Sequence, residues 1–322
     1  MGVLDSVRNA YPKVADQVET LEKFVEDLIG SVQGGDFLKR YHAPDYVMKE
    51  IVADDTPPAG IYGVGATAVD AGGEVCPAVF VIPGLAGDPL APVAIRDAPV
   101  AQLLGWLTEL PGLVAVGLPK PTEHVGPGHG PNVIVGGELS WRERAGRCGL
   151  EVAAASQQKT VLTAGHFARA CHTCVEAGGA RVGEVAHTDY LARHQPADLV
   201  ADVALVQLDS GVSVSSVRPV AGRGTGKQLD NIVSDGAHGT QKGWVRSLVR
   251  SFALRQDSGR WGEILITDRA ISYPGDSGAP VYLDDDSRIT IGHVVAGAVP
   301  AYSLVQDINY ILHSIPGGVT LV

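Results

Sequence analysis

From residue 132 to its end, this 322-residue chain contains only short apolar runs, and turn residues interrupt them at close intervals. One such run is 203–208, which begins directly after Asp202, and another is 281–283, which follows Pro280. Short strands separated by frequent turns are typical of β-barrels. We therefore expect a mainly β structure for this part of the chain, with no helical pattern before about 303–313.

The beginning of the chain differs, because its apolar residues recur at helical spacing. They are Val14, Val18, Leu21, Val25 and Leu28. Pro12 suits a first helical turn and Gly30 suits the end of a helix. The pattern predicts an amphipathic helix over 13–29. We expect its apolar face to pack on the chain itself, and keep as an alternative that it binds a second copy of the chain or a regulatory partner.

Changes in composition divide the chain into four predicted parts. They are an N-terminal helical region (1–55), a small α/β module (56–119), a linker rich in proline and glycine (120–131) and the β domain (132–322). Within the module we predict strands at 61–69, 78–82 and 113–118 and a helical or mixed segment at 100–107. Three prolines and three glycines in the linker exclude regular structure there.

Two glycines in the first predicted strand need an explanation. Gly63-Val64-Gly65 is too short for a dinucleotide-binding fingerprint. We attribute these glycines to close packing of the backbone against a neighbouring strand.

Ser277 lies in a sequence that suits a catalytic nucleophile, Gly275-Asp276-Ser277-Gly278. Gly275 can adopt backbone dihedral angles that a side chain forbids. The amides of Gly275 and Ser277 would then point at one place and form an oxyanion hole. Two other Asp-Ser-Gly tripeptides, at Ser210 and Ser258, lack the preceding glycine and indicate ordinary turns.

A serine hydroxyl needs a base, and the base needs a group that orients it. The predicted base is His166, at the end of an apolar run, and the predicted carboxylate is Asp202, at the start of another. Two alternatives remain: His166 is a structural histidine, or Asp198 takes the place of Asp202.

Three segments resemble the active-site motifs of chymotrypsin-like serine proteases. They are Thr163-Ala164-Gly165-His166, Asp202-Val203-Ala204-Leu205 and Gly275-Asp276-Ser277-Gly278-Ala279-Pro280. Their order along the chain is also the order of that family. The resemblance covers roughly residues 132–322. It implies a double β-barrel and a serine endopeptidase that acts on proteins or peptides without a cofactor.

A narrower resemblance includes the α/β module. The chain is similar to trypsin-like proteins of the plant narrow-leaf type and their bacterial relatives, in which a small α/β region precedes the protease. The similar segments are 63–65, 79–81, 274–278 and the predicted glycine-rich hairpin 236–245. This resemblance implies an intracellular housekeeping or regulatory protease that forms oligomers.

The family resemblance also implies a position for the primary substrate pocket. Six residues before the nucleophile, at the base of that pocket, the chain has Ile271, where trypsin-like enzymes have an aspartate. Val295, Ala296 and Gly297 would form the strand edge that pairs with the substrate backbone. The resemblance thus implies a neutral or aliphatic pocket.

Residues 134–137 resemble the new N-terminus of activated chymotrypsin-like enzymes. Cleavage between Val133 and Ile134 would free an ammonium group that could pair with Asp276. Because no basic residue precedes this bond, we expect an ordinary strand here and keep processing as the alternative.

The charge of the chain excludes two classes of partner. A net charge of −11 argues against nucleic acid or an anionic membrane surface as a partner.

The beginning of the chain shows no secretory signal pattern, so we expect a cytoplasmic protein, and the composition suggests a bacterial source. Thiols are then the expected state of the cysteines, which are Cys76, Cys148, Cys171 and Cys174.

Two alternatives for the cysteines remain. The family resemblance allows a disulfide between Cys148 and Cys171 or Cys174. The pair Cys171 and Cys174 also has the spacing of half a zinc site, but no second pair follows, so we expect no metal.

Two other function classes use the same residues. One is a pseudoprotease or peptide-binding scaffold, which presents peptides without cutting them. The other is a serine esterase that acts on small acyl groups through Ser277.

Overall fold

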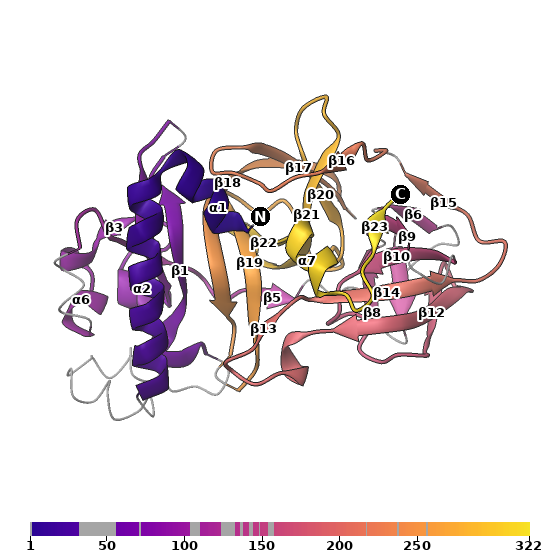
Figure 1. Ribbon diagram of the computed structural model, residues 1–322, viewed down its shortest axis with the longest axis horizontal. Helices are drawn as coiled ribbons and strands as arrows, with labels where there is room; N and C mark the ends of the chain where they lie inside the picture. Colours follow the sequence, from indigo (N-terminus) through magenta and orange to yellow (C-terminus); the bar gives the residue numbers. More distant parts are fainter. Residues whose placement is uncertain are drawn as a thin grey trace.

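The computed structural model describes residues 2–31, 56–70, 72–103, 110–123, 133–135, 138–141, 144–147, 149–153, 158–216, 218–236, 238–255 and 257–322. In Figure 1 the N-terminal elements lie at the left, a ring of strands lies in the middle, and a second sheet lies at the right. Most of the predicted linker, the pair Gly136 and Gly137, and Cys148 lie outside the described residues.

Six antiparallel strands close into a ring in the middle of the molecule. They are β17 (Asn231–Gly236), β18 (Gly239–Ala253), β19 (Arg260–Thr267), β20 (Pro280–Leu283), β21 (Ile289–Ala298) and β22 (Tyr302–Asp307). The pairing runs β19-β22-β21-β20-β17-β18 and returns to β19. The interior of the ring is an apolar cluster that includes Val245, Leu265, Val281 and Ile291. Closure leaves no free edge along the paired parts of these strands.

A second, eight-stranded sheet lies beside the ring. In spatial order its strands are β23 (Thr320–Leu321), β9 (Glu151–Ala153), β10 (Lys159–Thr163), β14 (Val203–Leu208), β12 (Ala180–Asp189), β11 (Cys174–Ala177), β7 (Glu138–Trp141) and β8 (Arg144–Arg147). This sheet has its own core, formed by residues such as Val161, Phe167, Val185 and Val206. A further cluster, with Leu162, Tyr282 and Ile311, joins the sheet to the ring through α7 (Ile308–Ser314).

The long strand β18 joins the α/β module to the ring. Its first half pairs with β17, and its second half pairs with β1 (Ile61–Ala68), while β19 lies along its other side. From β1 the sheet continues through β2 (Val75–Val81), β4 (Val114–Gly117) and β3 (Val93–Ala94). The predicted module and β domain therefore share one continuous sheet. The domain boundaries predicted from composition stay a prediction.

The glycines of β1 allow this pairing. A Cβ atom on Gly63 would lie 2.3 Å from the carbonyl oxygen of Ser251, and one on Gly65 would lie 2.1 Å from that of Leu248. The two strands approach each other too closely for any side chain at these positions. This close approach agrees with the expectation from the sequence.

Two helices cover the sheet at the N-terminal side. The predicted helix is α2 (Pro12–Ser31), and it packs on β1 and β2, as Figure 1 shows. Its buried side chains include Ala15, Val18, Leu21 and Val25, so its apolar face lies against the chain itself. A preceding helix that we did not predict, α1 (Val3–Ala10), buries Val3 and Val7 in the cluster that fills the ring.

The mainly β fold with a small α/β region and an amphipathic helix at its start is confirmed. The helix expected at about 303–313 begins later, because the residues up to Asp307 form β22. Asp307 is the N-cap of α7, and its carboxylate accepts hydrogen bonds from the amides of Asn309 and Tyr310 at 2.8 and 3.0 Å. The segment 100–107 is helical at α6 (Val100–Leu103), and its later residues lie outside the described residues.

One expectation about the linker is wrong. Within 120–131, β5 (Thr122–Glu123) forms regular structure because it pairs with β21.

The remaining short elements are η1 (Pro58–Gly60), α5 (Pro83–Ala86), η2 (Ile95–Asp97), β6 (Val133–Val135), η4 (Leu191–Arg193), β13 (Leu199–Val200), β15 (Val214–Ser216) and β16 (Gly222–Arg223). Among the described helices, none is long and apolar enough to cross a bilayer.

The contact between β1 and β18 leads to a stability prediction. We expect Gly65→Ala to lower the free energy of unfolding by about 1–3 kcal/mol, because the new methyl group would force the two backbones apart. The matched control is Gly72→Ala, since a Cβ atom there would have no neighbour within 4 Å. Urea unfolding of both variants measures the difference, and equal unfolding midpoints would contradict the prediction.

Candidate active site

Ser277 lies on a tight turn just before β20. Gly275 and Gly278 have φ values of 101° and 90°, which favour glycine. The amide of Asp276 donates to the carbonyl of Tyr273 at 2.9 Å, and the amide of Tyr273 donates back to the Asp276 carboxylate at 2.9 Å. The turn is therefore held by reciprocal bonds on the side of the chain that precedes Ser277.

The other side of the turn is anchored to β21. The amide of Gly278 donates to the carbonyl of Val294 at 2.9 Å, and the amide of Val294 donates to the carbonyl of Ala279 at 2.9 Å. The amides of Gly275 and Ser277, the predicted oxyanion donors, do not take part in the hydrogen bonds that hold this turn among the described residues. Both donors thus stay available for a ligand.

His166 and Asp202 meet because two strands of the second sheet are in register. Strand β10 pairs with β14 so that Thr163 lies opposite Ala204. The residues that follow β10 and precede β14 therefore lie at the same end of the sheet. Between them, Gly165 is required, since a Cβ atom there would lie 1.7 Å from the carbonyl oxygen of Asp189.

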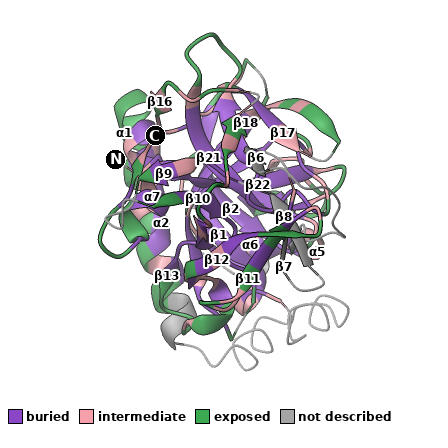
Figure 2. Cartoon of the chain, turned by 90° about the vertical axis from the view of Figure 1, so that its right-hand side faces the viewer, coloured by how far each residue is buried: buried purple, intermediate pink, exposed green. Residues whose placement is uncertain are grey.

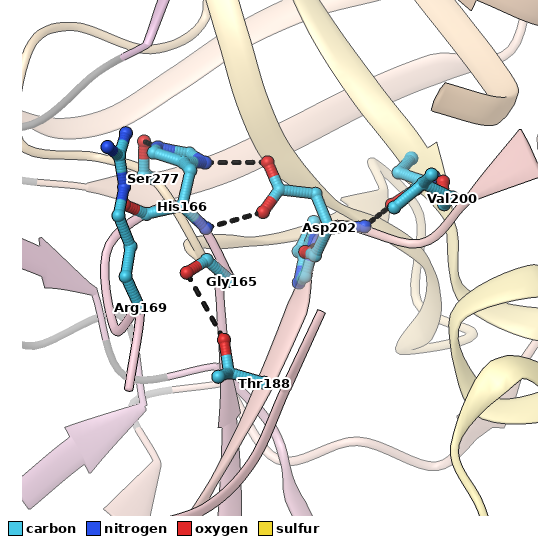
Figure 3. A network of polar contacts seen from close by, with 9 residues as sticks. Gly165, His166, Arg169, Thr188, Val200, Asp202 and Ser277 are labelled. Atoms are coloured by element: carbon cyan, nitrogen blue, oxygen red, sulfur yellow. Dashed lines mark hydrogen bonds and ion pairs between the residues drawn. The ribbon is translucent and has the colours of Figure 1, made fainter. Parts of the chain in front are cut away.

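Figure 3 shows the contacts of the histidine. His166 Nδ1 lies 2.6 Å from Asp202 Oδ2, and the backbone amide of His166 donates to Asp202 Oδ1 at 2.7 Å. His166 Nε2 lies 2.7 Å from Ser277 Oγ. The structure therefore brings together the three side chains that the sequence singled out. Asp198, the alternative carboxylate, instead accepts a bond from the amide of Gln195 at 3.0 Å.

Two further residues hold the loop that contains His166. Arg169 Nε donates to the carbonyl of His166 at 2.8 Å, and Thr188 Oγ1 donates to the carbonyl of Gly165 at 3.3 Å (Figure 3). These bonds fix the backbone on both sides of the histidine's attachment point. The orientation of its ring is thus set by the backbone as well as by Asp202.

Gln306 and His293, which sequence reasoning missed, support the backbone of Asp202. The amide of Asp202 donates to Gln306 Oε1 at 2.8 Å, and Gln306 Nε2 donates to the carbonyls of Val200 and Gly262 at 2.9 Å each. His293 Nε2 donates to the carbonyl of Asp202 at 3.0 Å. Both residues come from the ring, so they link the two sheets at the site. Their wide separation from Asp202 in sequence left no local signal.

The site is buried in this structure. Ser277 and Asp202 are 0% exposed and His166 is 1% exposed. In Figure 2 the strands β21 and β22, near the middle of the molecule, are likewise mostly buried. Low solvent exposure strengthens the electrostatic interaction between His166 and Asp202.

The predicted pocket residues occupy two different environments. Ile271 is 1% exposed and belongs to the apolar cluster inside the ring, where it lies near Gly243. The hydroxyl groups of its neighbour Ser272 and of Ser303 form a hydrogen bond of 2.7 Å. Ser303 Oγ also accepts a hydrogen bond from the amide of Ile271 at 3.0 Å. These two serines were not among the residues predicted for the pocket.

The predicted strand edge lies in β21. Val295 and Ala296 are fully buried, and Ala296 and Gly297 pair with β5 on one side and with β22 on the other. The edge is therefore covered by a segment of the same chain.

The structure describes some of the residues 134–137 and three of the four cysteines. Ile134 lies in β6, which pairs with β15, as expected for an ordinary strand. Processing at the bond between Val133 and Ile134 stays a prediction. Cys76, Cys171 and Cys174 are free thiols, and the described residues contain no cluster of three or more metal-ligating side chains.

Comparison with known proteins gives a limited result. No family model matches the chain, and no curated protein matches its sequence. Among solved structures, Nocardiopsis protease is 20% identical with a TM-score of 0.48, over 59% of this chain and 98% of that chain. Thermobifida fusca protease A is 19% identical with a TM-score of 0.48, over 59% and 100% of the two chains.

A glutamic-acid-specific serine protease is 18% identical with a TM-score of 0.48, again over 59% of this chain and 100% of that chain. These three solved structures are proteases. Because the identities are low and the TM-scores lie below 0.5, we base the function proposed below on the geometry of the site.

His293 leads to a prediction about pH. Burial lowers the pKa of His293 from 6.5 to about 4, so the folded protein binds this proton more weakly than the unfolded chain. The stabilisation is complete above pH 6.5 and is lost as the pH falls through about 4. We expect wild-type protein to lose about 2 kcal/mol of unfolding free energy between pH 7 and pH 4.5 through this group.

The test is urea unfolding of His293→Gln at both pH values. The glutamine amide can still donate to Asp202 but does not titrate, so the dependence on pH should become weaker by about that amount. His172→Gln is the control, since the His172 side chain is 82% exposed. An equal change in the pH dependence of the unfolding free energy for both variants would contradict the prediction.

Proposed function

We propose that this protein is a serine endopeptidase that cleaves peptide bonds through an acyl-enzyme at Ser277. The observation that supports this most strongly is the continuous hydrogen-bonded series from Asp202 through His166 to Ser277, at 2.6 and 2.7 Å. Nucleophile, base and orienting carboxylate at such distances define the geometry needed for acyl transfer.

The proposed first step is attack by Ser277 Oγ on the carbonyl carbon of the substrate. With the proton of neutral His166 on Nδ1, where Asp202 accepts it, Nε2 is free to take the proton of the serine hydroxyl. The Asp202 carboxylate then stabilises the imidazolium ion. Gln306 and His293 keep the backbone of Asp202 in place during this change of charge.

The remaining steps use the same groups. The amides of Gly275 and Ser277 would stabilise the tetrahedral oxyanion, a contribution of about 3–4 kcal/mol per donor at comparable sites. His166 returns its proton to the leaving amine, which breaks the peptide bond and leaves the acyl group on Ser277. It then removes a proton from the water molecule that hydrolyses the acyl-enzyme.

The geometry favours an endopeptidase over the two alternatives. A peptide-binding scaffold would have no need for His166 to lie within hydrogen-bonding distance of both Asp202 and Ser277. An esterase for small acyl groups would have no need for a strand edge at Ala296 and Gly297 that pairs with an extended backbone segment. The pairing at this edge supports an extended peptide as the substrate.

The catalytic role of Ser277 can be tested directly. Ser277→Ala should abolish both labelling by a fluorophosphonate and cleavage of casein, and Asp202→Asn should lower kcat about 10⁴-fold. Ser210→Ala is the matched control, because Ser210 also lies between an aspartate and a glycine but is exposed. Equal labelling of wild type and Ser277→Ala would refute the proposal.

We also propose a neutral primary pocket that prefers small or apolar side chains before the cleaved bond. Ile271 brings no charge to the position of the pocket base, and the hydroxyl groups of Ser272 and Ser303 form a hydrogen bond with each other. A peptide library digested by wild-type protein should show Ala, Val or Leu before the cut more often than Lys, Arg or Glu. Ser277→Ala provides the background, and a preference for charged residues would contradict the pocket assignment.

A further inference from the structure

The two-residue strand β5 lies on the edge of β21 that the proposed function assigns to the substrate. Glu123 pairs with Ala296 and Thr122 pairs with Gly297, in antiparallel orientation. Thr122 Oγ1 also donates to the carbonyl of Gly297 at 3.3 Å. In Figure 1, β5 lies between the ring and the second sheet.

This edge has room for only one strand. On its other side, Ala296 and Gly297 pair with Leu304 and Ser303 of β22. A peptide that binds by adding a strand needs the same backbone donors and acceptors that β5 uses. A substrate backbone and β5 therefore cannot pair with Ala296 and Gly297 at the same time.

The chain just before β5 is firmly attached to the body of the protein. The amide of Leu118 donates to Val81 at 2.9 Å, and Leu118 is 1% exposed. The hydroxyl group of Tyr302 donates to the carbonyl of Pro119. Only a few residues separate these anchors from Thr122, so the local concentration of β5 at the edge is far higher than that of a free peptide.

We propose that β5 is an internal competitor that occupies the backbone-binding edge of the active site, so that substrate must displace Thr122 and Glu123 before it can be cleaved. This proposal rests on the proposed function, which identifies the edge as the substrate site. It agrees with the burial of Ser277 and His166 in this structure. The proposed state is a resting state in which the triad is assembled and the adjoining substrate edge is filled.

The test compares two double variants of the full chain. Thr122→Pro with Glu123→Pro removes both N–H groups, so neither residue can donate to β21. Thr122→Ala with Glu123→Ala is the matched control, because it retains the backbone donors and loses only the side chains. The measurements are kcat/KM for an extended octapeptide and the rate of labelling of Ser277 by a fluorophosphonate.

We expect the proline pair to raise kcat/KM for the octapeptide about tenfold, and the alanine pair to change it by less than about threefold. In the Ser277→Ala background, the proline pair should also bind the uncleaved octapeptide about tenfold more tightly, measured by fluorescence anisotropy. Tighter binding without catalysis identifies competition for the edge as the cause.

The outcomes separate this proposal from the proposed function. Labelled Ser277 together with unchanged or lower octapeptide cleavage and binding in the proline pair would overturn the role of β5. No labelling of Ser277 in any of the proteins would overturn the proposed function instead.

A second pair guards against a folding defect. If the melting temperature of the proline pair lies well below that of wild type, the double variant Thr122→Gly with Glu123→Gly replaces it. Glycine weakens a strand but keeps its backbone N–H donors. An increase of about threefold in octapeptide binding is expected for the glycine pair, and no increase would again overturn the proposal.

Discussion

The buried carboxylate of Asp202 is the group on which the site depends. A charge removed from water is costly unless it is paired and hydrogen-bonded. The carboxylate of Asp202 meets this requirement through its contacts with the imidazole and the backbone amide of His166. The backbone of Asp202 is held by Gln306 and His293. Because these partners come from both sheets, the requirement also fixes how the two sheets pack.

The same network links stability to chemistry. His293 stays neutral because it is buried, and its neutral imidazole donates a hydrogen bond to the carbonyl of Asp202 without placing a second positive charge beside His166. Gln306 connects Asp202 to Val200 and Gly262 through one side chain. The precision of the triad thus depends on residues that take no part in the proposed chemistry.

The parts of this protein that could be predicted are those whose cause is local in sequence. The turn at Ser277 needs glycine at positions 275 and 278, where φ is positive, and the spacing of apolar residues in α2 shows which face of the helix is buried. Gln306 was missed because its role exists only when β19 and β22 pair. The strand β5 was missed because a strand of two residues is defined by its partner and not by its own composition.

The long strand β18 has a consequence for how the protein can be divided. Residues 247–252 pair with β1, so removing the α/β module would leave a row of unsatisfied backbone groups along this edge. The side chains of Leu248 and Val249, now fully buried, would lose part of their cover. Such an edge is a template for aggregation, so we expect the ring and the α/β module to stay soluble only as parts of one polypeptide.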